Sequence, residues 1–192
     1  ISSLMGFYRS KPKNPKDLVK SLKYYLNRYD LAVASTSPDN SKVLQKLSIE
    51  ISNPISLLKG MALQSEEDVS RGEYDLQMFL IREVYDSGLF EMLCCEIEKF
   101  PFEARKDAVI IFNSLIRRQI PPNRQIVAEH VRDHKSDILK TLLTFYDRPE
   151  RTLHYGLMLR ECVKFEFLAE IILNMTEFEK LFDYIQLPTF DV

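Results

Sequence analysis

The sequence has no tryptophan, and only five of its 192 residues are glycine. Hairpin turns rely on glycine, and the chain also lacks any sustained alternation of apolar and polar residues, which excludes a β-rich fold. No apolar run approaches the ~18 residues of a membrane-spanning helix, and no signal-peptide pattern opens the chain. We therefore predict an almost wholly helical protein of the cytoplasm.

A large excess of charge of either sign is also missing, because the formal net charge is -2 and the pI is near 6.0. Nucleic acids and anionic membranes select a concentrated basic surface, so neither is expected as the main partner. Glycine-rich phosphate loops, a GxSxG motif and calcium loops are absent from the sequence. We therefore predict a protein that binds rather than catalyses, and that holds no cofactor or metal.

The three cysteines, Cys94, Cys95 and Cys162, have no metal-ligand spacing. They lie on or beside apolar helix faces, where a thiolate is disfavoured. We expect them to be reduced, buried thiols.

The strongest pattern in the chain is a helical apolar stripe within residues 102–120. Its members recur at i, i+3, i+4, i+7 and i+8, the spacing of one helix face: Ala108, Ile111, Phe112, Leu115 and Ile116. The same spacing returns 47 residues later, at Tyr155, Met158, Leu159, Cys162 and Val163. We therefore predict that helices at 104–119 and 149–164 are neighbours in a repeat.

The helices directly upstream of these two also match each other, with an offset of 49 residues. The first set is Leu89, Phe90, Leu93, Cys94 and Ile97, and the second is Ile138, Leu139, Leu142, Leu143 and Tyr146. A period in the high forties is close to that of HEAT and armadillo units, which bury their apolar faces by stacking. The predicted fold is an all-α, armadillo/HEAT-like right-handed helical solenoid over residues 14–192, preceded by a flexible lead-in at 1–13.

Pro54 interrupts an otherwise helical pattern. A proline inside a helix removes one hydrogen bond and clashes with the preceding turn, at a cost of about 3 kcal/mol. We expect a kink there, or a new helix capped by Asn53 that ends at Gly60. The last residue, Val192, is apolar, whereas solenoids need a polar terminal unit, so we expect this chain to be the front part of a longer protein.

Two histidines, His130 and His134, stand at i, i+4 and therefore share one helix face, as some zinc sites require. The zincin motif would have glutamate directly after the first histidine, and Val131 is there instead. No third ligand is evident nearby, so a solvated helix face is favoured over a metal-dependent hydrolase. His154 is expected on the polar side of its helix or at the repeat junction.

Basic residues recur at equivalent depth in the two main helices. Lys164 lies 47 residues after Arg117, the same offset that separates the two apolar stripes, and Arg118 and Arg160 lie nearby. Cations are favoured at helix C-termini in any case, so a solvated basic patch is the simpler interpretation. The alternative is a stripe that binds a partner.

Several strings also resemble a known family: KNPKDLVKSLK at 13–23, GLF at 88–90, FEARKDAVIIFNSLIRRQI at 102–120, GLMLRECVKFEFLAEIIL at 156–173 and TFDV at 189–192. They are similar to the scaffold family of mouse protein twenty-five, also called calcium-binding protein thirty-nine, with its fungal Hym relatives. The resemblance runs over essentially the whole chain. Family proteins continue well past the TFDV string.

The resemblance implies a horseshoe of armadillo-like repeats without catalysis. Family members grip the kinase fold of a sterile-twenty-related adaptor pseudokinase or of sterile-twenty-type kinases, and hold it in a closed, active-like shape. With the adaptor they also assemble liver kinase B, and fungal relatives serve morphogenesis and polarity kinases. Phe190 matches the family's TFD phenylalanine, which contacts the partner kinase.

The expected partner-binding residues are thus Phe190, Arg117, Arg160 and Lys164. The main alternative is a generic cargo- or peptide-binding helical-repeat adaptor. Karyopherin-type grooves usually carry ladders of asparagine and tryptophan, and the absence of tryptophan speaks against that class.

Overall fold

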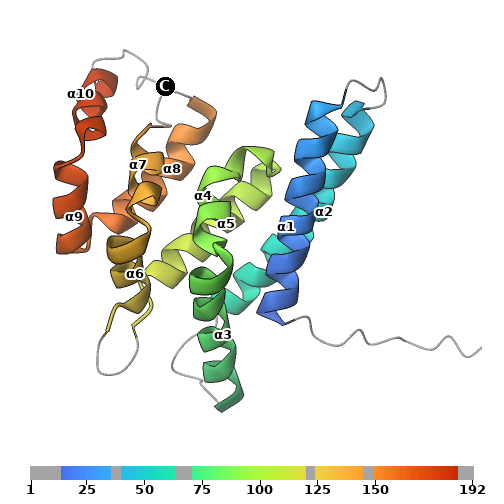
Figure 1. Ribbon diagram of the computed structural model, residues 1–192, viewed down its shortest axis with the longest axis horizontal. Coiled ribbons are helices and arrows are strands. Elements are labelled where there is room, and N and C mark those ends of the chain that lie inside the picture. Colours follow the sequence, from blue (N-terminus) through green and yellow to red (C-terminus); the bar gives the residue numbers. More distant parts are fainter. Residues whose placement is uncertain (1–13, 36–39, 64–70, 120–123, 145–148, 186–192) are drawn as a thin grey trace, which may run out of the picture.

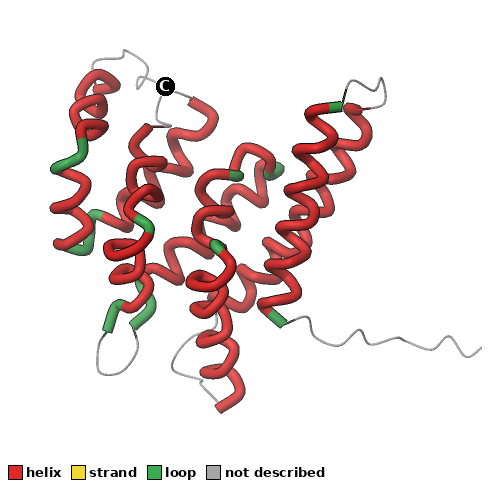
Figure 2. The backbone as a smooth tube through the Cα atoms, viewed as in Figure 1, coloured by secondary structure: helices red, strands yellow, loops and turns green. Residues whose placement is uncertain are grey.

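The computed structural model describes residues 14–35, 40–63, 71–119, 124–144 and 149–185, and within these ranges it contains helices and no β-strand (Figure 2). The helices follow one another in the order α1 (Pro15–Ala34), α2 (Asn40–Ala62), α3 (Arg71–Ser87), α4 (Leu89–Cys95), η1 (Ile97–Lys99), α5 (Phe102–Ile116), α6 (Ile126–His134), α7 (Ser136–Thr144), α8 (Pro149–Cys162), α9 (Glu166–Leu173), η3 (Thr176–Glu179) and α10 (Lys180–Ile185). The all-α prediction is confirmed for this part of the chain.

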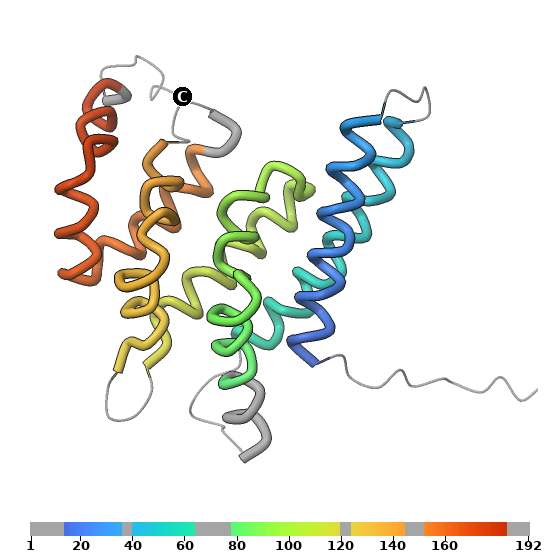
Figure 3. The backbone as a smooth tube through the Cα atoms, in the orientation of Figure 1, coloured from blue at the N-terminus to red at the C-terminus, as the bar shows by residue number. Residues whose placement is uncertain are grey.

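The helices are laid side by side in chain order, so that α1 and α2 form one end of an elongated molecule and α9 and α10 form the other (Figures 1 and 3). Contacts run between successive groups of three: α3 touches α6, α4 touches α7, and α5 touches α8. The row that contains α5 and α8 begins with α2, which packs on α5. The molecule is therefore a helical solenoid.

The two helices that the 47-residue offset predicts as neighbours, α5 and α8, are in contact. Their boundaries differ slightly from those expected, since α5 covers Phe102–Ile116 and α8 covers Pro149–Cys162. All five stripe residues of α5 are buried, but Val163 in the second stripe is 44% exposed. The helix has already ended at Cys162, so the helical spacing no longer directs Val163 toward the core. The right-handed sense of the solenoid stays a prediction.

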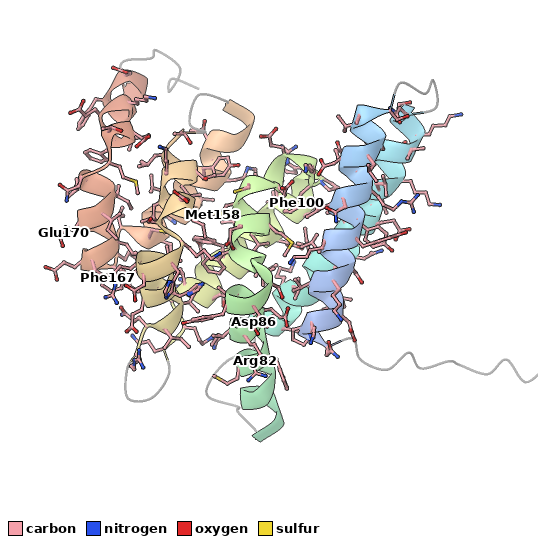
Figure 4. The ribbon with its side chains drawn as sticks, in the orientation of Figure 1. Arg82, Asp86, Phe100, Met158, Phe167 and Glu170 are labelled. Carbon is pink, nitrogen blue, oxygen red and sulfur yellow. The ribbon has the colours of Figure 1, made fainter. Side chains whose placement is uncertain are left out.

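One continuous apolar core runs from α1 to α9. Near its middle the rings of Phe90 in α4 and Phe112 in α5 lie 4.4 Å apart. The Tyr155 hydroxyl of α8 donates to the carbonyl of Cys94 at 2.8 Å, and the Cys94 thiol lies 3.9 Å from the sulfur of Met158, which is labelled in Figure 4. The two contacts of Cys94 join one group of three helices to the next, because Cys94 belongs to α4 whereas Tyr155 and Met158 belong to α8.

Polar contacts also set the register between α2 and α5. Lys59 and Asp107 form an ion pair at 2.7 Å. At the end of α2, the carbonyl of Ala62 accepts from the Ser114 hydroxyl at 2.6 Å and from the Arg118 guanidinium at 2.9 Å. The last carbonyls of a helix have no partner within the helix, so α5 satisfies one that α2 leaves open.

The expectation for Pro54 is wrong in one respect, because α2 continues through it as a single helix from Asn40 to Ala62. Asn53 is inside that helix and does not cap a new one. Pro54 is itself buried, and Ile51 and Ile55 beside it are fully buried. The packing of this face against α1 and α5 outweighs the roughly 3 kcal/mol that an internal proline costs.

Two local signals in the sequence do produce the expected helix ends. The Asn14 side chain accepts from the backbone N–H of Asp17 at 2.8 Å, which caps α1 ahead of Pro15. Gly88 separates α3 from α4 with φ of 69°, a left-handed conformation that suits glycine.

The first testable prediction concerns the stripe of α5. Leu115 is 1% exposed, so Leu115→Ala should lower the free energy of unfolding by about 2–5 kcal/mol, through lost apolar burial and the cavity left behind. Leu153→Ala is the control, because that side chain is 67% exposed and should change stability by only about 0.5 kcal/mol. Urea unfolding curves measure both. Equal midpoints for the two variants would contradict the assignment of Leu115 to the core.

Candidate functional site

The outward faces of α5 and α8 combine apolar and cationic side chains. On α5, exposed residues recur at helical spacing, with Phe102 61% and Ile110 37% exposed. On α8, Leu153 is 67% exposed. We call this surface the α5–α8 face and define it by Phe102, Lys106, Ile110, Asn113, Arg117, Leu153, Leu157, Arg160 and Lys164.

The aromatic end of the α5–α8 face is ordered by a cation. The ammonium of Lys106 lies 4.2 Å from the centre of the Phe102 ring, within range of a cation–π contact, and also pairs with Glu103 at 3.0 Å. The ring of Phe102 meets that of His154 edge-on at 6.4 Å. His154 is 4% exposed, so it is at the junction of the two helices rather than on the polar side.

Two of the predicted cations, Arg117 and Lys164, meet at one buried carboxylate. Glu161 is only 3% exposed, and its oxygen lies 3.6 Å from Arg117 Nε and 3.0 Å from Lys164 Nζ. Both cations are more than half exposed at their side chains. Arg117 and Lys164 therefore have an internal role: they neutralise Glu161 across the α5–α8 junction while their outer parts still face solvent.

Arg160 is the predicted cation whose charge is not engaged in this way. It is exposed on α8, and it forms no ion pair with the residues that the structure describes. Phe190, the remaining predicted contact residue, lies outside the described residues. The structure thus places three of the four predicted residues in or directly after the last turns of α5 and α8, and it brings Arg117 and Lys164 together at Glu161.

The sequence interpretation missed the anion of this cluster. Glu161 is not one of the recurring basic residues, so that pattern does not predict it. Its position directly before Cys162, at the end of an apolar stripe, was the available signal, because it places a carboxylate at the edge of the core. The sequence interpretation also does not include Phe102 and Ile110 as surface residues, although they lie about four and two turns before Arg117 on the exposed side of α5.

Asn113 joins the same junction. Its side-chain nitrogen is 3.5 Å from the carbonyl of Leu157 on α8, and its side-chain oxygen is buried without a hydrogen-bond partner. The α5–α8 contact is therefore polar at Asn113 and at Glu161, and apolar at the buried stripe beneath them.

Of the paired histidines, His134 is exposed as expected, whereas His130 is buried and does not lie on a solvated face. His130 is 8% exposed, its ring centre is 5.3 Å from that of His134, and it also stacks on Tyr85 at 4.0 Å. Among the described residues, no group of three histidine, cysteine or acidic side chains is arranged to hold a metal ion. The zinc alternative thus gains no third ligand in the part of the chain that the structure describes.

The cysteines agree with the expectation at two of three positions. Cys94 and Cys162 are buried, whereas Cys95 is exposed. Burial raises the pKa of the Cys94 and Cys162 thiols well above their ordinary range, and partial burial also raises the pKa of Cys95. Each thiol is therefore protonated near neutral pH, which disfavours nucleophilic chemistry at these positions.

Among the described residues, no helix combines the length and the apolarity that crossing a membrane requires.

The sequence of this chain is similar to a family model and to several known proteins. A family model described as Mo25-like matches residues 6–192. A human protein named calcium-binding protein 39-like is 35% identical over 188 residues, which cover 98% of this chain and 52% of the relative. MO25-like protein 2 of Caenorhabditis elegans is 34% identical over 180 residues, covering 94% of this chain and 51% of the relative.

A fungal relative also matches, the conidiophore development protein hymA of Emericella nidulans. It is 26% identical over 171 residues, which cover 87% of this chain and 41% of that protein. This chain spans about half the length of the curated relatives it matches. The family resemblance drawn from the sequence strings is confirmed.

The second testable prediction concerns the Glu161 cluster. Arg117→Ala and Lys164→Ala should each cost less than about 1 kcal/mol, because one cation remains and both are half exposed. The double variant should lose about 1–3 kcal/mol beyond their sum, since it leaves the buried carboxylate unpaired. Adding Glu161→Gln to the double variant should restore most of that loss. A thermodynamic cycle from urea unfolding measures the coupling, and strict additivity would show that the cluster is not a unit.

Proposed function

The chain belongs to the Mo25-like family, and we propose that it is a non-catalytic scaffold that binds a sterile-twenty-type kinase or a related adaptor pseudokinase. In this proposal the scaffold holds the bound kinase fold in its closed, active-like arrangement and so regulates signalling in polarity and morphogenesis. The observation that carries the proposal is the match of the family model to residues 6–192.

The energetic requirement on such a scaffold is modest. The open and closed arrangements of a kinase fold differ in free energy by a few kcal/mol. A ligand shifts the population toward the arrangement that it binds more tightly, by as much as its two affinities differ. A change from about 1% closed to about 99% closed needs a preference of about 5.5 kcal/mol for the closed form. A rigid surface that fits only the closed form supplies this preference without any chemical step.

The α5–α8 face has the composition expected of such a surface. Exposed Phe102, Ile110 and Leu153 offer apolar contact area, and aromatic and arginine side chains are the commonest energetic anchors of interfaces. The cations around them favour a partner surface with acidic residues, since charge complementarity speeds encounter and excludes wrong partners. We infer that the kinase side of the contact is apolar at its centre and acidic at its edge.

Phe190 is proposed as a second anchor. It follows Pro188 and Thr189 near the end of the chain, where an aromatic ring can project from a turn. Packing of this ring against a further helical unit is the competing role. The resemblance of the TFD string to the family's kinase-contacting string favours the anchor.

Binding and activation together test the proposed function. The purified chain would be titrated into a sterile-twenty-type kinase domain and into a related pseudokinase, with affinity measured by calorimetry and kinase activity by phosphate transfer. Saturable one-to-one binding with raised kinase activity is expected. A folded chain that binds none of these kinase folds would refute the scaffold proposal.

The third testable prediction uses the cation of α8 that no described residue neutralises. Arg160→Glu should lower the association rate with the kinase by up to about tenfold at low salt, because it reverses a steering charge. The difference should shrink as salt is raised, since screening shortens the range of exposed charges. The matched control is Lys20→Glu, which makes the same change at an exposed site on α1. Equal rates for both variants would place the contact elsewhere.

The fourth testable prediction separates the two roles of Phe190. If the ring contacts the kinase, Phe190→Ala should weaken binding and activation while the melting temperature stays nearly unchanged. Differential scanning fluorimetry and calorimetric titration report the two quantities. Unchanged binding with a melting temperature lowered by several degrees would identify Phe190 as a core residue.

A further inference from the structure

Three rings are stacked where α3 meets α6. Tyr85 of α3 lies on His130 of α6 at 4.0 Å between ring centres, and His134, one turn further along α6, lies 5.3 Å from His130. The Tyr85 hydroxyl donates to the backbone carbonyl of Ile126 at 2.7 Å, which ties α3 to the first turn of α6. The stack therefore sits in the contact between two successive helix groups of the solenoid.

His130 is buried here without hydrogen bonds. Both of its ring nitrogens are inaccessible to solvent and have no partner among the described residues. A neutral imidazole already loses its water contacts on such burial, and an imidazolium loses far more because its charge is desolvated. Burial at this site therefore favours the neutral imidazole of His130 over the charged imidazolium.

We propose that the Tyr85–His130–His134 stack is a pH-sensitive joint, which holds α3 against α6 while His130 is neutral and loosens when His130 takes up a proton. The affected contact lies between successive helix groups, so loosening it alters how the groups are stacked. Nothing in the kinase-scaffold proposal assigns this role, and it does not depend on that proposal.

Charged or titratable groups from α3, α4 and α6 lie near His130. Glu91 comes from α4 and is paired with Lys135, which follows α6. On α6 itself, Asp133 is held by Arg132 at 2.6 Å, and His134 is the stacked neighbour. The α3 side contributes the phenol of Tyr85.

None of these groups forms a hydrogen bond with His130, whose ring nitrogens have no partner among the described residues. Glu91 has one oxygen engaged by Lys135, and its other oxygen is buried without a partner. Asp133 lies in the exposed part of α6 and is occupied by Arg132. The Arg82 and Asp86 side chains, labelled on α3 in Figure 4, are exposed one turn from each other and flank Tyr85.

Together these surroundings lower the pKa of His130 below the ordinary value of 6.5. The largest cause is burial, followed by His134 and Lys135, whereas Glu91 and Asp133 act in the opposite direction. The unfolded chain therefore binds the proton more readily than the folded one. Above pH 6.5 the joint has its full stability. Stability falls as the pH drops below that value, until the folded-state pKa is passed.

The fifth testable prediction follows from this linkage. His130→Phe keeps an aromatic ring in the stack but cannot take up a proton, so its melting temperature should fall less than that of the wild-type protein between pH 7.5 and pH 5.5. The two melting temperatures should change by amounts that differ by up to about 3–6 °C over this pH range. His134→Phe, at the exposed neighbour, is the comparison variant: because His134 helps to lower the pKa of His130, this change should reduce the pH dependence without abolishing it, whereas His130→Phe should remove it.

A direct measurement on the wild-type protein completes the test if His130→Phe does not fold. The imidazole resonances would be followed by NMR from pH 4.5 to pH 8, with His134→Phe used for assignment, and amide hydrogen exchange would be recorded in α3 and α6. The proposal expects His130 to titrate below 6.5 and exchange to accelerate in both helices as it does so. Titration at or above 6.5, or exchange in α3 and α6 that does not change with pH, would overturn it.

Discussion

The structure depends on the burial of each helix's apolar face against a helix that is nearly fifty residues away in sequence. Phe112 of α5 stacks on Phe90 of α4 within its own group, and α5 is in addition packed between α2 and α8, so that Phe112 and Leu115 are almost completely buried. Burial of these faces contributes about 25 cal/mol for each Å² of apolar surface removed from water. Summed over the contact between two helices, this contribution exceeds that of any single polar contact. A helix group isolated from its neighbours would leave this surface exposed.

Polar contacts between the same helices decide how the apolar faces are aligned. Apolar burial has little directional preference, so a helix can slide by a turn at small cost. The ion pair of Lys59 with Asp107 and the bonds from Ser114 and Arg118 to Ala62 each require one alignment of α2 and α5. Glu161 does the same for α5 and α8. The cost of leaving such groups unpaired makes other alignments unfavourable.

This division of roles connects the fold to the proposed function. The core residues hold α5 and α8 in contact with each other, and the exposed side chains of the two helices are then presented together as the α5–α8 face. Because Arg117 and Lys164 also neutralise Glu161, part of this face is pre-ordered before any partner arrives. Pre-ordering reduces the conformational entropy that association would otherwise cost.

The sequence by itself determined the helical class, the positions of the apolar stripes and the pairing of α5 with α8, because helix periodicity and the recurrence of a stripe are properties of residue order alone. It also placed Arg117, Arg160 and Lys164 on related turns. Only the tertiary structure decided that Pro54 is accommodated within one helix, that His130 is buried, and that Glu161 is shared by two cations. Each of these depends on which distant helix packs against the residue, and burial and pairing energies come from that neighbour rather than from the local sequence.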